Sequence, residues 1–517
     1  MYEKYAIDRP IDMKLNVRPV YNALIHQVAF EGPCRFGDKD ELTKEFDELS
    51  AKEGFKRFSA RIASIGEGNP DINMLEPVLT TGTDEFVYQE DVFEKLAENV
   101  GDVDVFFIQA VSPSTSRLIA EMIERFGKPI ILFNSSGTIT EGNISSFHSR
   151  GVKEIYGVID WNQAELFMRA MKAKKALART RVLELFRHES EHYLTDDCNT
   201  KDTFGVQVTG VNIHEMFDML NTNENGTENY TLPLRKVYNL TAEDDAEAER
   251  VADELIASVD DSWIERDKVV KSVRFNILTR KLMNKWNCNA FTGQCKECCA
   301  TTRINNAQVT YCLGHSLNNE DRVVSACEGD LNALKAITVM ACLSRKAPYQ
   351  SNTSPIVLND DGSIMASMWF QPSSVVEEYP NELYCNWHAV PNRRMKDGYD
   401  SDNLLPVALG PFTASARFGA TFRHDFSQDK GEAVTLMRFN PEGTKMLVTR
   451  SHVLDGTGYE RYGCPEGFYY RITNRDEFFQ TQIEFGSHMV MVFGDYLKEL
   501  KAFAKIMHLE MVTFTDD

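Results

Sequence analysis

Short apolar runs alternate with amphipathic segments in the N-terminal part of the chain, and this alternation limits the folds that the chain can adopt. Residues 104–111, 130–133 and 154–159 are apolar runs of strand length, and residues 114–126 carry apolar side chains at helical spacing. Strands that alternate with helices predict a parallel sheet, because each helix returns the chain across one face of the sheet. We therefore predict a Rossmann-like α/β subdomain over residues 1–160. No Gly-x-Gly-x-x-Gly motif follows these strands, so dinucleotide binding is not predicted.

The rest of the chain divides at residues 347 and 348, where helical patterns give way to short strands and turns. Residues 161–347 are predicted to form a second α/β subdomain, and residues 348–517 a mostly antiparallel β domain. The predicted elements are helices at 163–187, 213–220, 242–259, 268–286 and 496–507, strands at 204–209, 433–439 and 445–449, an edge strand at 289–291, and a polar loop at 221–232.

The chain has 517 residues and a formal net charge of −21, which bounds its partners. Phosphate contacts need a surplus of Lys and Arg, so nucleic acid and anionic membranes are not expected as general partners. The N-terminal residues lack the apolar core of a secretion signal, and no run approaches the roughly 20 apolar residues of a membrane helix. These features predict a cytoplasmic protein.

Seven of the eleven cysteines fall between Cys288 and Cys342. Cysteines of a cytoplasmic chain are expected to be mostly thiols. Cys295, Cys298 and Cys299 form a Cys-x-x-Cys-Cys string that would suit zinc or an iron–sulfur cluster, but no second pair at the usual spacing accompanies it. The alternative is that the cysteines of this region are small buried apolar residues.

One carboxylate and two histidines in apolar settings predict a metal site built from distant parts of the chain. Glu328 follows a small residue and a Cys and precedes a Gly, where an apolar run ends and a helix pattern begins. A carboxylate beside bare backbone is placed for a pocket rather than for a solvated face. His388 and His488 lie among apolar residues. The alternatives are a carboxylate that only complements the helix dipole, as expected for the capping residue Asp330, and histidines that are satisfied in the core.

Several strings, in order along most of the chain, resemble elements of the L-fucose/L-arabinose isomerase family. These elements are its second-subdomain signature, a His-Cys-Thr-x-Pro-x-x-Met element, two β-domain strands, a Gly-Asn-His-His-x-x-x-x-Gly-Asp element, and an Arg-Pro after its first strand. The matching strings here are Cys312-Leu-Gly-His-Ser-Leu-Asn-Asn-Glu320 with Ser325-Ala-Cys-Glu-Gly-Asp-Leu-Asn332, His388-Ala-Val-Pro-Asn-Arg-Arg-Met395, residues 417–422 and 433–438, Phe485-Gly-Ser-His-Met-Val-Met-Val-Phe-Gly-Asp-Tyr496, and Val17-Arg-Pro19.

The resemblance implies a fold, a reaction and a metal. Family members are metal-dependent aldose–ketose isomerases, usually with Mn²⁺, built from two Rossmann-like subdomains and a β-rich C-terminal domain and assembled as trimers or hexamers. It implies that Glu328 is a metal ligand and the catalytic base, that His488 is a second ligand, and that His388 coordinates the metal or hydrogen-bonds a substrate hydroxyl. Isomerisation through a cis-enediol moves a proton between C1 and C2, which needs a base beside both carbons and a Lewis acid at their oxygens.

Asn352 is the main departure from the family pattern. It is the best match to the family's second carboxylate ligand, yet an amide carries no charge. Its oxygen can coordinate a cation but cannot act as a base, and one negative charge fewer weakens metal affinity. Either the site runs a modified isomerisation with Asn352 in it, or the chain has moved to other chemistry. A second departure is Met489, where the family usually has another His.

Five further residues are candidates for substrate binding. The resemblance implies that Arg18 holds a substrate oxygen, and Gln294 and Trp387 are additional pocket candidates. Arg393 and Arg394 lie near the predicted site, and two guanidiniums there would suit a phosphate, sulfonate or carboxylate. An anionic sugar such as sulfoquinovose, or a deoxy sugar, is therefore a candidate substrate. The alternatives are a surface salt bridge for Arg18 and a solvated pair for the other two arginines.

Together these features predict a homo-oligomeric, Mn²⁺-dependent aldose–ketose sugar isomerase of the cytoplasm. Two alternatives stay open. One is a non-catalytic sugar-binding relative whose metal site has degenerated at Asn352. The other is a metal-dependent epimerase or lyase on the same scaffold.

Overall fold

The computed structural model describes residues 4–27, 43–83, 87–110, 115–134, 140–186, 201–213, 216, 240–295, 307–365, 373–460 and 462–517. The chain divides into two compact units, one of Met13–Lys172 and one of Met1–Asp12 with Ala173–Asp517. The larger unit therefore contains most of the predicted second subdomain and all of the predicted β domain. Within the described ranges, no helix is long and apolar enough to cross a bilayer.

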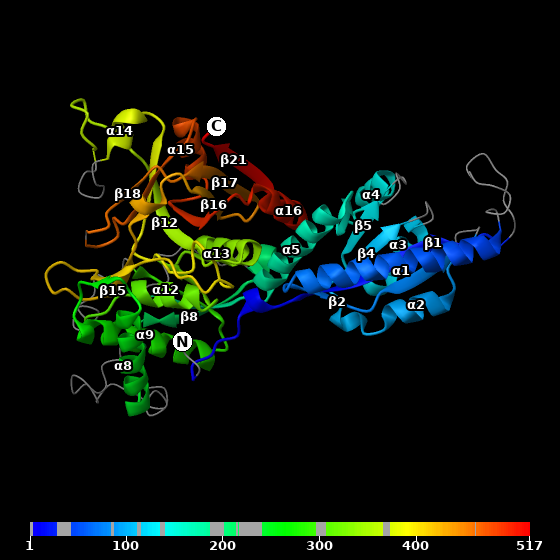
Figure 1. Cartoon of the computed structure of the whole chain (residues 1–517), viewed down its shortest axis with the longest axis horizontal. Coiled ribbons are helices and arrows are strands. Elements are labelled where there is room, and N and C mark those ends of the chain that lie inside the picture. Colours follow the sequence, from blue (N-terminus) through cyan, green and yellow to red (C-terminus); the bar gives the residue numbers. More distant parts are fainter. Residues whose placement is uncertain are drawn as a thin grey trace. The chain divides into compact units, whose positions relative to one another are not determined.

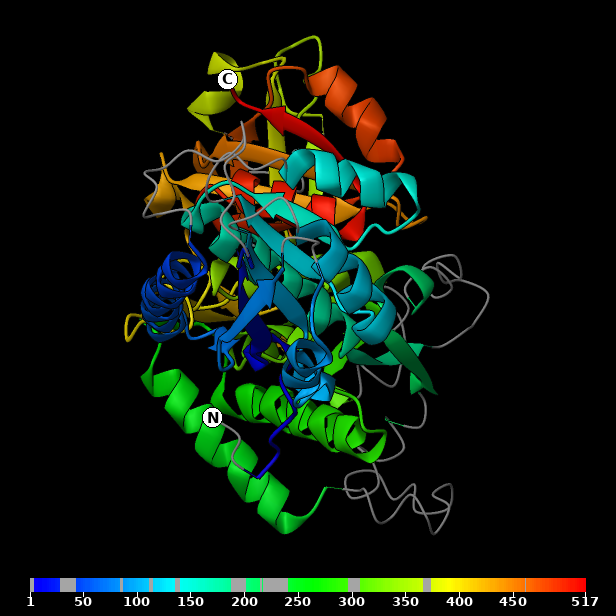
Figure 2. The ribbon, with the colours of Figure 1, turned by 90° about the vertical axis from the view of Figure 1, so that its right-hand side faces the viewer.

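The smaller unit is built on a six-stranded sheet in which the strand pairings are parallel (Figures 1 and 2). The strand order is β2-β1-β4-β5-β6, and β3 also pairs with β1. The predicted strands at 104–111, 130–133 and 154–159 and the helix at 114–126 are confirmed. The elements are β1 Leu15–Leu24, α1 Lys44–Gly68, β2 Ile72–Met74, β3 Val78–Gly82, α2 Glu90–Ala97, β4 Val105–Ala110, α3 Thr115–Phe126, β5 Ile130–Asn134, α4 Thr140–Ser149, β6 Ile155–Val158 and the start of α5 Trp161–Ala178.

Burial explains why these strands read as continuous apolar runs. Four consecutive residues of β4, Val105 to Ile108, are fully buried, so both faces of the strand are covered. Leu118, Ile119 and Met122 of α3 lie in the same apolar cluster as alternate residues of β4. The apolar residues at helical spacing in the sequence therefore form the face of α3 that packs against the sheet.

The larger unit contains a four-stranded parallel sheet of order β11-β10-β7-β8. These strands are β7 Arg181–Phe186, β8 Gln207–Asn212, β10 Ala290–Gly293 and β11 Val324–Cys327. Two predictions were wrong here. The predicted helix at 163–187 ends at Ala178, and its last residues form β7 because Val182, Leu183 and Leu185 are buried between neighbouring strands. The predicted edge strand β10 is an interior strand, paired with β11 and β7.

Two predicted helices beside this sheet are confirmed as α8 Ala242–Ala257 and α9 Arg266–Lys285. A three-stranded sheet of order β15-β14-β9 joins them to later parts of the chain, with β9 Asp261–Ser262, β14 Ala408–Pro411 and β15 Ala420–Arg423. Leu409 and Phe422 of that sheet share a core cluster with α8 and α9. The predicted helix at 213–220 lies mostly outside the described residues, and the predicted loop at 221–232 lies wholly outside them.

The C-terminal part forms an eight-stranded sheet that is antiparallel except for one parallel pair, β17 with β21. This confirms the predicted β-rich character, the strands at 433–439 and 445–449, and the helix at 496–507; the final strand β21 was not predicted. The sheet order is β18-β19-β13-β12-β20-β16-β17-β21. Its elements are β12 Tyr349–Pro355, β13 Leu383–Trp387, β16 Ala433–Phe439, β17 Lys445–His452, β18 Asp455–Thr457, β19 Gly467–Arg471, β20 His488–Phe493 and β21 Glu510–Thr515, with α14 Ser374–Glu378, α15 Arg475–Ile483 and α16 Leu497–Met507.

Helix α13, Leu331–Ser344, connects the parallel sheet to the antiparallel one. It follows β11 directly, and it packs against β12, β16 and β20, as Figure 1 shows for β12 and β16. Residues Leu331 to Leu343 are all buried, which fits a helix that is apolar around most of its circumference. The three residues between β11 and α13 therefore lie between the two sheets, and they include Glu328.

Candidate metal centre

Glu328 begins the connection from β11 to α13. It has a φ of 65°, and Gly329 follows with a φ of 70°. A non-glycine residue in the left-handed region is uncommon, and such strain recurs at active sites and ligand clamps. The turn places the Glu328 carboxylate at the carboxyl end of a parallel strand, where open α/β sheets bind ligands. Its side chain is only 12% exposed.

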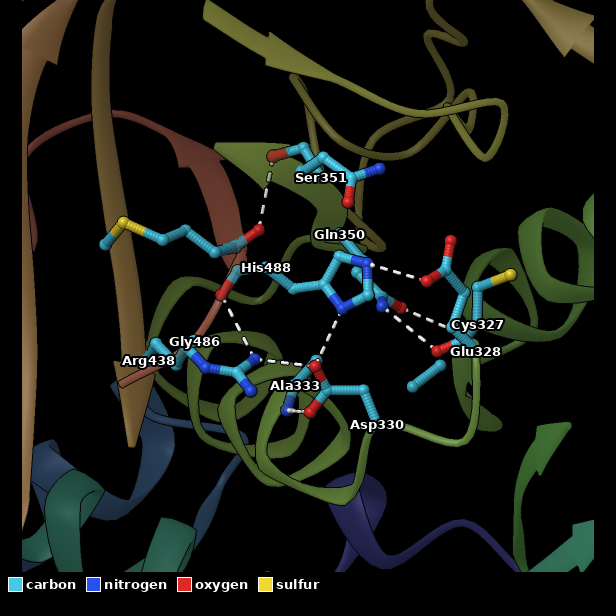
Figure 3. A network of polar contacts seen from close by, with 12 residues as sticks. Cys327, Glu328, Asp330, Ala333, Gln350, Ser351, Arg438, Gly486 and His488 are labelled. Atoms are coloured by element: carbon cyan, nitrogen blue, oxygen red, sulfur yellow. Dashed lines mark hydrogen bonds and ion pairs between the residues drawn. The ribbon is translucent and has the colours of Figure 1, made fainter. Parts of the chain in front are cut away.

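Gln350 of β12 holds the peptide unit before Glu328. Its Oε1 accepts a hydrogen bond from the Cys327 N–H at 2.7 Å, and its Nε2 donates to the Cys327 carbonyl at 3.1 Å (Figure 3). Gln350 is 2% exposed, so these two bonds are shielded from water. The amide links the two sheets at the residue that precedes the carboxylate. Sequence reasoning missed Gln350, because nothing local marks a buried Gln as a partner of a distant strand.

His488 is the first residue of β20, and its ring lies between two carboxylates (Figure 3). Its Nε2 is 3.5 Å from Glu328 Oε2, and its Nδ1 is 2.7 Å from Asp330 Oδ2. Burial alone would raise the pKa of Asp330, but Arg438 and His488 outweigh burial and hold it well below its usual range. Asp330 is thus an ionised acceptor, so Nδ1 of His488 carries a proton, and in the neutral ring the Nε2 lone pair faces Glu328.

Asp330 therefore has two roles, of which the sequence predicted only one. Its Oδ1 accepts from the Ala333 N–H at 2.8 Å and caps α13, as expected. Its Oδ2 accepts from His488 and, at 2.7 Å, from Nη1 of Arg438 on β16. Arg438 also donates to the His488 carbonyl at 3.1 Å. A Cβ at Gly486, which has a φ of 106°, would lie 2.9 Å from the Arg438 guanidinium, so this position requires glycine.

His388 follows β13, and its Nε2 is 3.6 Å from Glu328 Oε1. The imidazoles of His388 and His488 therefore lie near different oxygens of the Glu328 carboxylate, and their ring centroids are 5.8 Å apart. The Ala389 N–H donates to His388 Nδ1 at 3.0 Å. The neutral ring therefore carries its proton on Nε2, the opposite tautomer to His488. In this orientation His388 presents a donor, and His488 presents a lone pair.

Glu328 and Nε2 of His488 fit a divalent cation by position and chemistry, and His388 lies beside them with a hydrogen-bond donor. One ligand atom of each lies within 4.8 Å of the others. Both Nε2 atoms are buried and have no hydrogen-bond partner among the described residues, which is costly unless a ligand satisfies them. Imidazole and carboxylate ligands suit Mn²⁺, Fe²⁺, Co²⁺ and Zn²⁺. The three sites predicted from the sequence are thus brought together by the fold.

Asn352 lies beside this cluster on the same face of the sheet as His488. The two residues are directly opposite each other in the β12–β20 pair, and such residues have Cβ atoms about 4.5–5.5 Å apart. Its Nδ2 donates to the Trp387 carbonyl at 3.5 Å. Trp387 is its opposite neighbour on β13, so both predicted residues belong to this part of the sheet. The position is 9% exposed and uncharged.

Arg393 and Arg394 have partners within the protein. Arg393 binds Glu320 through Nε at 2.9 Å and Nη2 at 2.6 Å, and its Nη1 donates to the Ser258 hydroxyl at 2.8 Å. Arg394 donates to the carbonyls of Gly398 and Ser401. These contacts remove the support that the two arginines gave to an anionic substrate.

The other two predicted substrate residues lie in different units. Gln294 is buried at the end of β10, where its N–H donates to the Leu185 carbonyl at 3.0 Å, so it shares the carboxyl edge of the parallel sheet with Glu328. Arg18 lies on β1 of the smaller unit, and its Nη2 donates to the Glu98 carbonyl at 3.0 Å. Its role in substrate binding stays a prediction.

The described cysteines are free thiols, and all except the half-buried Cys464 are buried. Of the Cys-x-x-Cys-Cys string only Cys295 lies within the described residues. A hydrogen bond with Cys295 lowers the pKa of the Cys327 thiol, but burial and the charge of Glu328 outweigh it and raise that pKa to about 12. The thiol next to the candidate metal centre is therefore protonated and apolar in character.

Comparisons with known proteins add no family assignment. No model of a protein family matches the chain, and a search of curated proteins finds no match.

Proposed function

We propose that this chain is a divalent-metal-dependent aldose–ketose isomerase of the L-fucose/L-arabinose isomerase type. The observation that carries the proposal is the convergence of Glu328, His388 and His488 from segments 60 and 160 residues apart by their numbers into one buried cluster with metal-ligand spacing. The resemblance of the strings around these residues to family elements supports the same reading.

Each residue of the cluster has its own proposed role in isomerisation. A bound divalent cation would supply Lewis acidity at the oxygens of C1 and C2. Glu328 is the carboxylate that takes the proton from C2 and returns it to C1, while the hydroxyl proton of O2 passes to O1. His388 donates its Nε2–H to a substrate oxygen and so holds the sugar in register with Glu328. His488 is held in its ligand tautomer by Asp330.

The proposal also includes the two Rossmann-like subdomains and the oligomeric assembly of the family. The strand order β2-β1-β4-β5-β6 of the smaller unit is that of a doubly wound, flavodoxin-like sheet, which supports a Rossmann-like subdomain. The sheet β11-β10-β7-β8 would be the second such subdomain. A cytoplasmic homo-oligomer, trimeric or hexameric, would agree with the family.

The substrate we propose is a neutral or deoxy aldose. The anionic alternative rested on Arg393 and Arg394, together with the carboxylate that is missing at Asn352. The Arg393 guanidinium is paired with Glu320, both side chains being 7% exposed, and a substrate anion would have to displace that partner.

The test is an NMR assay in D₂O of metal-stripped protein, with and without Mn²⁺, against neutral, phosphorylated and sulfonated aldoses. Mn²⁺ is removed before spectra are taken. We expect Mn²⁺-dependent ketose formation, with deuterium entering at C1 or C2 as the enediol route requires. Glu328→Gln should abolish turnover and leave the circular dichroism spectrum unchanged. Turnover retained in Glu328→Gln would contradict the assignment of Glu328 as the base.

Asn352 favours one second candidate, a sugar-binding relative without catalysis, because it removes a charge beside the cluster. Binding of an aldose without turnover or metal dependence would establish that alternative. An epimer or a cleavage product in the same assay would instead indicate an epimerase or lyase on this scaffold.

A further inference from the structure

The larger unit has a cavity that shares no residue with the metal cluster. Its volume is about 590 Å³, within the range of sites for small molecules. The cavity opens over the β9–β14–β15 sheet and the residues after β18. Its lining consists of Asp261, Trp263, Pro411, Arg417, Arg423, Tyr459, Glu460 and Tyr462.

Aromatic rings form the walls of this cavity and are held in place by polar contacts. The rings of Trp263 and Tyr459 meet at 75°, with centroids 5.2 Å apart. Trp263 Nε1 donates to Asp261 Oδ2 at 2.6 Å, which fixes the indole. Arg417 donates to the Tyr462 hydroxyl at 3.2 Å and to the Trp263 carbonyl, so it joins the third ring to the first. The aromatic surface is thus built before any ligand arrives.

The packing of the Trp263 ring against the backbone of β14 supports the same position of the ring. A Cβ at Gly410 of β14 would lie 3.2 Å from Cε3 of Trp263 and 3.1 Å from Cγ of Arg423. The indole therefore lies close against the strand. Tyr462 is 44% exposed, so one aromatic wall stays open to solvent.

The charges around the cavity select the class of ligand. Arg423 is paired with Glu466, whose Oε2 is 3.1 Å away, with both side chains buried. Burial raises the pKa of Glu466 to about 7, so the pair is fully balanced above neutral pH. The remaining charged groups of the lining are Arg417, Asp261 and Glu460, which include both signs. The lining thus has one more carboxylate than free guanidinium, and a ligand with a full charge of either sign meets at least one group of its own sign.

We propose that this cavity binds a neutral saccharide. A pyranose ring has apolar C–H faces that pack on aromatic rings, and hydroxyls that donate to carboxylates and accept from a guanidinium. These are the two kinds of surface that the cavity offers. The proposal does not depend on the isomerase function, because the two sites have no residue in common.

Saturation-transfer NMR on the full-length protein tests the proposal. The protein carries Glu328→Gln and is kept free of metal, so that sugar binding at the metal cluster does not dominate the signal. The probes are D-glucose, D-galactose, L-fucose and maltose, with choline as a cation and inorganic phosphate, followed by ³¹P line width, as an anion. We expect transfer to the ring C–H protons of at least one sugar and no binding of either charged probe.

Two substitutions locate the binding. Trp263→Ala and Tyr462→Ala should each weaken the sugar by about tenfold, the factor that corresponds to roughly 1.4 kcal/mol of lost contact. Trp286→Ala is the matched control, since Trp286 is an exposed Trp at the end of α9 and does not line the cavity. Tyr462 is half-exposed, so its variant keeps the test valid if Trp263→Ala fails to fold.

Three results would overturn the proposal. These are the absence of transfer to all four sugars, equal transfer in the cavity variants and in Trp286→Ala, and binding of choline or phosphate in preference to the sugars. None of them bears on the isomerase proposal, whose own test is Mn²⁺-dependent ketose formation by the unsubstituted protein.

Discussion

The Nδ1 atom of His488 lies 2.7 Å from Oδ2 of Asp330, and this contact joins the first residue of β20 to the cap of α13. The same carboxylate caps the helix, receives Arg438 and decides which nitrogen of His488 can face Glu328. A carboxylate that orients a ligating histidine is a recurrent part of metal sites.

Replacing Asp330 tests this orientation. Asp330→Ser should still cap α13, because Ser is a good cap, but the shorter side chain loses His488 and Arg438. We expect Mn²⁺ to bind about 10- to 100-fold more weakly. The free energy of unfolding should fall by about 3 kcal/mol, because a buried Arg438 loses its partner. Mn²⁺ titration followed by electron paramagnetic resonance measures the first effect, and urea unfolding the second.

Arg438→Gln is the matched control for Asp330→Ser. It removes the same ion pair and should destabilise the fold similarly, but it leaves the Asp330–His488 bond in place. Mn²⁺ affinity should therefore fall much less than in Asp330→Ser. Equal losses in the two variants would mean that Asp330 acts through stability rather than through His488.

The two histidines of the cluster should respond differently to the same change. His488→Gln removes a lone pair that faces Glu328, so Mn²⁺ affinity should fall about 100-fold. His388→Gln removes a donor, so Mn²⁺ should bind within about tenfold of its original affinity while turnover falls about 10²-fold or more. Mn²⁺ titration and the D₂O assay separate the two effects. Equal losses of Mn²⁺ affinity would show that His388 is also a ligand.

Restoring a carboxylate beside the cluster should strengthen metal binding. Asn352→Asp adds a charged oxygen opposite His488, and ligand charge tunes the affinity for divalent ions, so we expect Mn²⁺ to bind about tenfold more tightly. Asn359→Asp adds the same charge at an exposed turn and should change the affinity little. An unchanged affinity in Asn352→Asp would place this residue outside the metal's reach.

His315 predicts how stability depends on pH. Burial, helped by the nearby His388, lowers its pKa to about 3, whereas an unfolded His titrates near 6.5. The unfolded chain therefore binds a proton first as the pH falls, and the stability present above pH 6.5 is lost progressively toward pH 3. Between pH 7.5 and 5.0 this residue should remove about 2 kcal/mol of unfolding free energy.

Urea unfolding at the two pH values measures this loss. His315→Gln cannot take up the proton, so its unfolding free energy should depend less on pH by that amount. His452→Gln is the control, because His452 is half-exposed and its side chain is 45% accessible. The same pH dependence in His315→Gln as in the original chain would contradict the prediction.

The sequence by itself determined the kind of most elements, and it predicted the three residues that the fold brings together around Glu328. The apolar runs of β4 to β6 and the Glu328-Gly-Asp330 string are local patterns, and their physical causes, burial of consecutive side chains and a left-handed turn into a helix cap, act over a few residues. Where a local helix preference competed with strand pairing between distant segments, the prediction from the sequence was wrong. Residues 181–186 follow a helix and contain good helix formers, yet pairing with β8 and β10 makes them a strand.

Only the tertiary structure decided what surrounds Glu328. Gln350, Arg438 and Asn352 reach it or its neighbours because β12, β16 and β20 lie side by side in one sheet, an order that no single segment encodes. The different tautomers of His388 and His488 likewise depend on one hydrogen bond each, to Ala389 and to Asp330. Partners of buried polar groups are chosen by the packing of distant strands, so residue type alone predicted a histidine in the site but not the atom that it offers.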